Sequence, residues 1–237
     1  MKDTKITRDR IQNHFTYSWW KYALLFAVAI FGWNIIYTTT KYQAPSDRRL
    51  GIYFVTHFIG ADTTDWIEQE TLRRDETLEE VSCISIALGG EEDQYYADVQ
   101  LSTYIAAGEG DIYIMTKEKF RNYAAMDGLI ALEDLVASRT INTGDMDLSK
   151  GYVKNDETGE VELYGIPADS LYGLLEKGID NKDLYICIMA HAKNEPAAER
   201  FINWFIQEMK AEKPEYLVLQ EETEENTGEI SVDIPSY

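Results

Sequence analysis

Cysteine and histidine are scarce in this chain of 237 residues, which has two cysteines and three histidines. Two cysteines cannot build the framework of several disulfides that stabilises small secreted domains. Both lie in β-like apolar runs, Cys83 within residues 81–88 and Cys187 within residues 183–190, so we expect buried free thiols, with a disulfide between them as the alternative. No cysteine–histidine spacing typical of a metal site occurs, and we predict neither a metal nor a cofactor.

Basic residues are also few, with 22 Lys and Arg against 42 Asp and Glu and a formal net charge of -20. The first forty residues carry five basic and two acidic side chains, so the remainder carries -23. A body this acidic repels nucleic acid and anionic lipid headgroups, which excludes nucleic-acid binding as its function.

Catalytic motifs are missing as well. No G-x-S-x-G occurs, and Gly108-Glu109-Gly110 lacks the rest of a dinucleotide-binding fingerprint. The histidines and carboxylates are scattered and form no recognisable acid–base pair. We therefore predict no catalytic residues and a protein that is not an enzyme.

One long hydrophobic run is present, YALLFAVAIFGWNIIY at residues 22–37. With its flanks it approaches the roughly 20 helical residues that a bilayer core requires. The run is apolar on all sides, whereas a buried core helix has one apolar stripe. The sequence therefore predicts a transmembrane helix over residues 19–40, in contact with membrane lipid.

The charge pattern around this run predicts its orientation. Five basic residues precede or open the run, and an excess of Lys and Arg marks the cytoplasmic side of a membrane. We expect residues 1–18 in the cytoplasm and everything from residue 41 outside the cell. A cleaved secretory signal is the alternative, but no small-x-small site follows Tyr37, which favours a retained anchor.

Residues 41–213 alternate between strand-like and helix-like segments. Apolar runs at residues 50–56, 79–88 and 111–115 alternate with helical segments that end near residues 74, 107 and 126. We expect Asp62, Thr63 or Thr64 to cap the first helix and Asp93 to cap the second. The order β-α-β-α-β-α predicts one α/β domain with a mostly parallel sheet flanked by helices.

The remainder of the chain breaks this rhythm. A hairpin is expected around residues 155–159, a buried strand at residues 183–190, and a long helix capped by Asn194. Residues 214–237 are acidic, so we expect a flexible tail. Two β-like pieces in it, residues 216–219 and 230–232, are candidates for adding to the sheet edge of a partner.

Several short motifs, in this order, resemble those of the extracellular solute-binding proteins of ABC importers. They are QLSTYIAAGEGDIYIM at residues 100–115, IALEDL at 130–135, YGIPA at 164–168 and AHAKNEPAAERFI at 190–202. Each motif is short and degenerate, and the evidence lies in their order over residues 50–210. The resemblance implies the first lobe of a periplasmic-binding-protein fold, which in that family closes with a second lobe on a ligand.

The second lobe of that family follows the motif matched here by residues 164–167. In this chain about fifteen residues separate that point from the strand at 183–190, whereas a lobe needs on the order of 100 residues. We therefore expect half of the fold, a single lobe that cannot enclose a solute.

The carboxyl ends of the strands are the usual ligand positions in an open α/β sheet. The candidate ligand-binding residues there are His57, Asp93, Tyr95, Asp169 and Ser170, each of which also has a structural interpretation as a cap, turn or loop residue.

The favoured hypothesis is a non-catalytic accessory protein that contacts an importer permease or a solute-binding protein. Direct binding of a solute, with sugars as the class that the resemblance implies, is the alternative. A third hypothesis is a sensory input domain, which would have to signal through a partner because the N-terminal segment is short.

Overall fold

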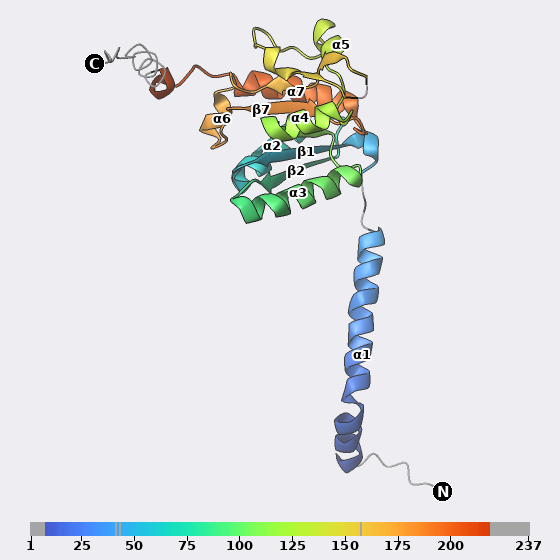
Figure 1. Cartoon of the computed structure of the whole chain (residues 1–237). Coiled ribbons are helices and arrows are strands. Elements are labelled where there is room, and N and C mark those ends of the chain that lie inside the picture. Colours follow the sequence, from blue (N-terminus) through green and yellow to red (C-terminus); the bar gives the residue numbers. More distant parts are fainter. Residues whose placement is uncertain (1–7, 41, 43, 157, 219–237) are drawn as a thin grey trace, which may run out of the picture. The chain divides into compact units, whose positions relative to one another are not determined.

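A computed structural model describes residues 8–40, 42, 44–156 and 158–218, without the side chains of residues 8–18, 39 and 91–93. The chain divides into two compact units, Met1–Gln43 and Ala44–Tyr237 (Figure 1). Most of the predicted flexible tail lies outside the described residues. Residues 216–218 are helical, with the N–H groups of Leu217 and Val218 donating to the carbonyl of Pro214, so the extended piece predicted there is wrong.

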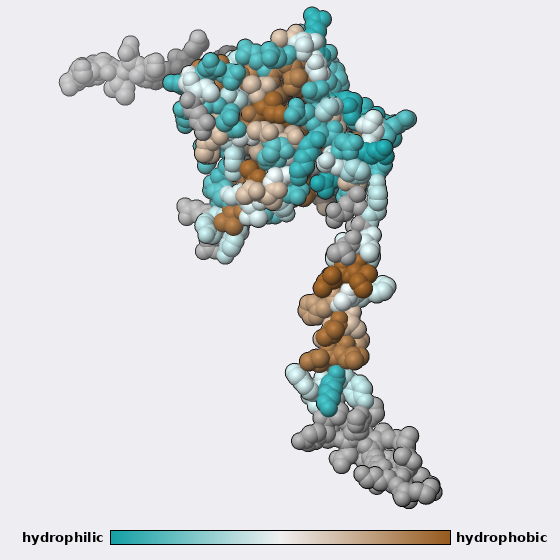
Figure 2. All heavy atoms as spheres, turned by 90° about the vertical axis from the view of Figure 1, so that its right-hand side faces the viewer, coloured by the Kyte–Doolittle hydropathy of each residue, from teal (hydrophilic) through white to brown (hydrophobic). Residues whose placement is uncertain are grey.

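The first unit is the helix α1, Arg8–Thr40. Its segment Trp19–Thr38 is long and apolar enough to cross a membrane. Large apolar side chains such as Leu25 and Phe31 are 69% and 70% exposed, and Figure 2 shows such side chains on its surface. A helix with this surface needs an apolar environment or a cover, which agrees with the predicted anchor.

The second unit is built on a five-stranded sheet with the order β2-β1-β3-β7-β6. The strands are β1 Arg49–Thr56, β2 Glu80–Ala87, β3 Ile112–Thr116, β6 Ile166–Pro167 and β7 Leu184–Ile188. β1 pairs in parallel with β2 and β3, whereas β7 lies antiparallel between β3 and β6. β7 alone in this sheet runs against the other four strands, and the predicted α/β class is confirmed.

Helices cover both faces of this sheet because alternate strand residues point to opposite sides. Phe54 and its neighbours on one face pack with α2, Ala61–Arg74, and α7, Glu195–Met209. Val55 and its neighbours on the other face pack with α3, Glu91–Ala106, and α4, Lys117–Ala125. The two cysteines are buried free thiols as predicted, and they belong to opposite faces, Cys83 to the first and Cys187 to the second.

Short elements complete the unit. The predicted hairpin is present as β4, Tyr152–Lys154, paired with β5, Val161–Leu163, and α5 is the helical segment Glu133–Ala137. α6 spans Gly173–Glu176, and the 3-10 turns η1 and η2 span Ser46–Arg48 and Ser149–Gly151.

The predicted caps of the first two helices are wrong. α2 begins after Gly60 and α3 after Gly90, and neither N-cap makes a side-chain hydrogen bond. In both, a glycine with extended backbone precedes the first turn, so the polar residues that seemed to be caps lie inside the helix. Asn194 does cap α7, because its side chain accepts a hydrogen bond from the backbone N–H of Ala197.

Asp111 ties the two ends of this unit together. Its buried carboxylate accepts hydrogen bonds from the backbone N–H groups of Gly51 at 2.8 Å, Lys193 at 2.7 Å and Asn194 at 3.1 Å. Gly51 belongs to the first strand, and the other two residues precede the last long helix. This carboxylate therefore joins segments that are more than 140 positions apart in the sequence.

Candidate functional site

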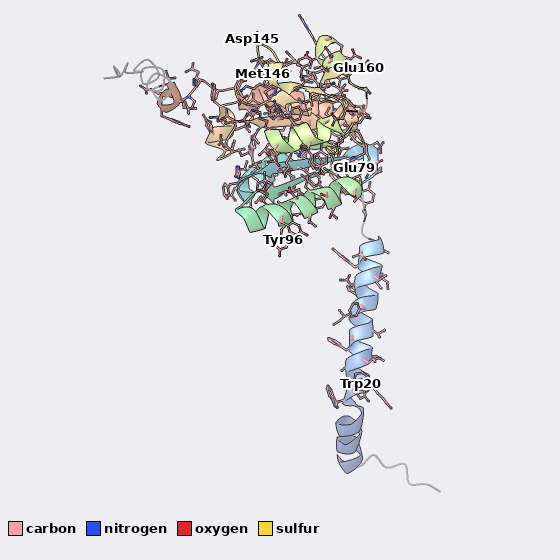
Figure 3. All side chains as sticks on the ribbon, viewed as in Figure 1. Trp20, Glu79, Tyr96, Asp145, Met146 and Glu160 are labelled. Carbon is pink, nitrogen blue, oxygen red and sulfur yellow. The ribbon has the colours of Figure 1, made fainter. Side chains whose placement is uncertain are left out.

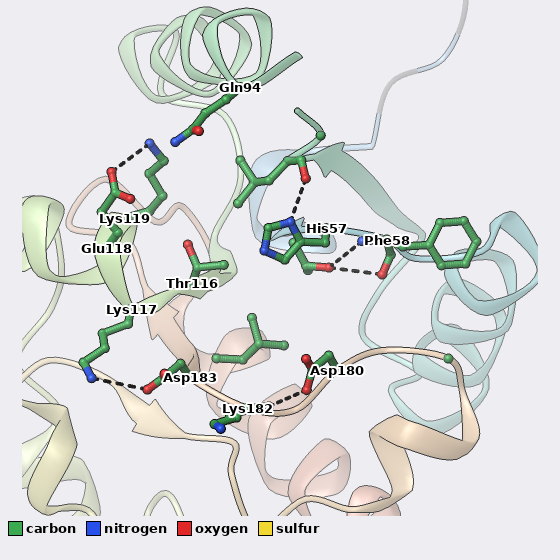
Figure 4. A pocket seen from close by; sticks show the side chains of 15 residues that line it. His57, Phe58, Gln94, Thr116, Lys117, Glu118, Lys119, Asp180, Lys182 and Asp183 are labelled. Carbon is green, nitrogen blue, oxygen red and sulfur yellow. Dashed lines mark hydrogen bonds and ion pairs between the residues drawn. The ribbon is translucent and has the colours of Figure 1, made fainter. Parts of the chain in front are cut away.

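A cavity of about 560 Å³ lies at the edge of the sheet where β1, β2 and β3 end and β7 begins. Its lining residues come from the segments after these strands, from the start of α3 and α4, and from the loop before β7 (Figure 4). Its size falls in the usual range for small-molecule sites. Half of its polar lining residues, including His57, Gln94 and Lys182, are exposed, so the cavity is open to solvent.

His57 is held in this cavity by one backbone contact. Its Nδ1 lies 2.8 Å from the carbonyl oxygen of Leu88, which follows β2. A carbonyl can only accept, so Nδ1 carries the proton and Nε2 is left as an acceptor. The neighbouring Phe58 is 67% exposed, and its ring points away from the imidazole (Figure 4).

The lysines that open α4 are already paired within the protein. Lys119 donates to Asp98 of α3 at 2.6 Å and lies 3.5 Å from Glu118, while Lys117 lies 3.4 Å from Asp183. Burial of Lys119 by itself lowers the pKa of its ammonium group, but the hydrogen bonds to Asp98 and Glu118 outweigh burial and the pKa is raised. Lys119 is therefore a charged link between α3 and α4.

Few polar groups of the cavity are left for a ligand. Lys182 forms no ion pair among the described residues. Neither the Thr116 hydroxyl nor the side-chain amide of Gln94 has a hydrogen-bond partner there. The Asp180 carboxylate accepts one hydrogen bond, from the backbone N–H of Lys182, and keeps further acceptor capacity. Together with Nε2 of His57, these groups offer one cation, one carboxylate, one side-chain amide, one hydroxyl and one imidazole. The described residues contain no group of His, Cys, Asp and Glu that could hold a metal ion.

The structure brings one of the five predicted site residues into this cavity, namely His57. Tyr95 lies on α3 and is 68% exposed outside the lining, and the side chain of Asp93, in the first turn of α3, is not described. Asp169 binds Lys150 at 3.0 Å and accepts from the N–H of Asp183 at 3.1 Å, which fixes the loop before β7. Ser170 is exposed next to it and does not line the cavity.

Sequence reasoning missed the basic and acidic residues at this edge, Lys117, Lys119, Asp180, Lys182 and Asp183. The first two immediately follow a predicted strand, so their position alone could have identified them. The other three precede β7, and they reach the same edge because β7 runs antiparallel to β3. The sequence pattern of a buried strand gives no direction, so this placement could not be inferred.

Comparisons with known proteins give structural matches but no sequence family. No family model matches the chain, and no curated protein matches it. A family 1 extracellular solute-binding protein from Alicyclobacillus acidocaldarius matches at 20% identity and a TM-score of 0.36, over 53% of this chain and 29% of its own. An ABC substrate-binding protein from Listeria monocytogenes, in complex with cycloalternan, matches at 19% identity and a TM-score of 0.36, over 49% and 28%.

RafE from Streptococcus pneumoniae matches at 15% identity and a TM-score of 0.33, over 53% of this chain and 29% of its own. Two de novo designed esterases also match, each at 16% identity. Two of these matches bear the names of solute-binding and substrate-binding proteins, the class that the sequence motifs resemble, and each covers about half of this chain. The chain spans less than a third of the length of each of these three solved proteins.

Proposed function

We propose that this chain is a membrane-anchored, non-catalytic protein whose extracellular α/β unit works by contacting another protein. Candidate partners are the permease of an ABC importer or the solute-binding protein that serves it. The observation that carries the proposal is the state of the cavity at the sheet edge, where both lysines of α4 already have carboxylate partners. A site built for solute capture would keep its charged groups free for the solute.

The remaining polar groups are too few for tight capture. His57, Gln94, Thr116, Asp180 and Lys182 offer about five hydrogen bonds to a solute. At about 1 kcal/mol each, they supply about 5 kcal/mol, which corresponds to a dissociation constant of about 0.2 mM. The described residues contain no second lobe to add contacts from the other side of the cavity.

The anchor keeps this unit at a membrane surface. The apolar segment Trp19–Thr38 is long enough for a span, and the basic residues before it support a cytoplasmic N-terminus. A protein held on the outer surface with an open cavity is suited to contact with a membrane complex rather than to diffusion with a captured solute.

Purification of the full chain from detergent-solubilised membranes of its own cells tests the proposal. We expect it to stay in the membrane after alkaline carbonate washing and to elute together with another membrane or surface protein. Recovery as a free monomer in several mild detergents would contradict the accessory role. Release by the carbonate wash would contradict the anchor.

Direct solute binding is the second candidate, because the cavity volume suits a small molecule. Titration calorimetry of the full chain in detergent with a panel of sugars decides between the two. Binding tighter than about 0.02 mM that His57→Ala weakens at least tenfold, with no loss when the exposed Asp62 outside the cavity is changed to alanine, would favour capture over partner contact.

A further inference from the structure

The outward surface of α3 carries little charge over three turns. Among residues 94–107 the one charged side chain is Asp98, and Lys119 pairs with it at 2.6 Å. Charged residues make up 27% of the whole chain, so a segment of this length would be expected to hold about four. We call the exposed residues of this segment the α3 face; they are Gln94, Tyr95, Tyr96, Val99, Gln100, Ser102, Thr103, Ala106 and Ala107.

The α3 face is also poor in free polar groups. The Thr103 hydroxyl donates to the carbonyl of Val99 at 2.7 Å, and the neighbouring Ser102 hydroxyl donates to the carbonyl of Asp98 at 2.5 Å. These two donors are used inside the helix, so apart from the tyrosine hydroxyls the side-chain amides of Gln94 and Gln100 are the main polar groups that the face offers to the outside.

Two tyrosines dominate the amino-terminal half of the face. Tyr95 and Tyr96 are 68% and 71% exposed, and their rings meet edge to face at 5.8 Å. Figure 3 shows Tyr96 extending away from α3. Neither phenol has a hydrogen-bond partner among the described residues. Exposed tyrosines on a surface with little charge are typical of the centre of a protein interface, where charged residues are depleted.

The charges that flank this face indicate the chemistry of its partner. The backbone of α3 places Glu91, Glu92 and Asp93 in the first turn, next to the tyrosines. A second copy of this chain is a poor occupant. Parallel pairing would bring two acidic first turns together, and antiparallel pairing would bring each one to the negative carboxyl end of the other helix. The acidity of the unit likewise disfavours an anionic membrane surface.

We propose that the α3 face is the docking surface for the partner protein, and that this partner offers an apolar groove with Lys or Arg beside it. The inference rests on the proposed function and assigns a location and a chemistry to the contact. The two tyrosines and Val99 of α3 fill the partner's apolar groove, and the partner's basic side chains complement the acidic first turn of α3.

Site-specific photo-crosslinking in the native cells is the first test. A photoreactive phenylalanine analogue replaces Tyr96 or Val99 in the full chain, and for the control it replaces Tyr152, which is 41% exposed on β4. We expect both α3 positions to give an adduct with the same protein and Tyr152 to give none with it. Equal adducts from all three positions, or adducts from α3 with lipid or with a second copy, would overturn the inference.

The affinity of the purified crosslinked protein for the full chain is the second test. Tyr95→Ala combined with Tyr96→Ala should weaken binding at least tenfold with unchanged thermal unfolding, because both side chains are exposed. Tyr152→Ala should leave binding unchanged. Glu91→Gln with Glu92→Gln should weaken binding and reduce its salt dependence.

The outcomes separate the inference from the proposed function. A partner that co-purifies and binds the α3 variants as tightly as the wild type refutes the docking surface and leaves the accessory role standing. The absence of any partner in the detergent purification and at every crosslinking position refutes both.

Discussion

The ion pair between α3 and α4 should respond unequally to removal of its two partners. The side chain of Lys119 is 9% exposed, whereas that of Asp98 is 43% exposed. Asp98→Ala would leave a buried ammonium group with Glu118 at 3.5 Å as its remaining described partner. Lys119→Met removes the buried charge itself and keeps a side chain of similar length.

The magnitudes follow from the cost of burying a charge. Breaking a fully buried pair costs about 3–5 kcal/mol, and since water reaches Asp98, we expect Asp98→Ala to cost about 2 kcal/mol. Lys119→Met should cost less than about 1 kcal/mol, because the lost attraction is offset by the lost desolvation penalty. For a unit of this size the unfolding temperature should fall by about 4–8 °C for Asp98→Ala and by less than about 4 °C for Lys119→Met.

Thermal unfolding of the full chain in detergent, followed by circular dichroism, measures these shifts. The double variant Asp98→Ala with Lys119→Met should behave like Lys119→Met alone, because it holds no unpaired buried charge. The pKa of Lys119 is raised in the folded wild type, so the pair stabilises fully below the unfolded pKa and less as pH rises through the folded one. Equal losses for the two single variants, or a double variant with the sum of both losses, would refute this reasoning.

Three further predictions concern packing and charge in the α/β unit away from the cavity lining. Tyr185→Phe should leave the unfolding temperature unchanged or raise it, because the buried hydroxyl has no partner among the described residues; a fall of more than about 3 °C would show a hidden partner. Gly151→Ala should lower the free energy of unfolding by at least about 2 kcal/mol, because a Cβ would lie 2.0 Å from the carbonyl oxygen of Gly165. In the control Gly90→Ala, the new Cβ meets no atom within 4 Å, so the change should cost little. Equal effects of the two variants in urea unfolding would contradict this packing. Hydrogen bonds from Arg73 and Arg74 lower the pKa of Glu70 from 4.5 to about 2, so the stabilising effect of its carboxylate is complete above pH 4.5 and lost as pH falls toward 2. The difference in unfolding temperature between wild type and Glu70→Gln should therefore vanish over this interval. A difference that stays constant would refute the link between this pKa and stability.

The order of elements was predictable because periodicity is a local property. The spacing of hydrophobic residues predicts buried runs such as residues 50–56, and it predicts the apolar face that includes Phe201 and Phe205. The exact starts of α2 and α3 were not predictable, because either an extended glycine or a polar capping residue can precede a helix. The local sequence contains both kinds of residue at each start.

The candidate site was predictable only in part. His57 follows a strand that the sequence reveals, so its position at the sheet edge could be inferred. The placement of the Asp180–Asp183 segment at that edge comes from the reversed direction of β7, and the ion pair of Lys119 joins it to Asp98 of another helix. Both depend on contacts between distant segments, which no local pattern records. The α3 face needed the structure as well, because exposure decides which side of an amphipathic helix is outermost.

The place of β7 in the sheet sets when this unit can fold. The strand is among the last parts of the unit to be synthesised, yet it lies between β3 and β6. A nascent chain that stops before residue 184 therefore leaves one edge of β3 without a neighbour and exposes the apolar surface that α7 later covers. Until about the last quarter of the chain has been added, the sheet is unfinished and its open edge and apolar surface are prone to aggregation.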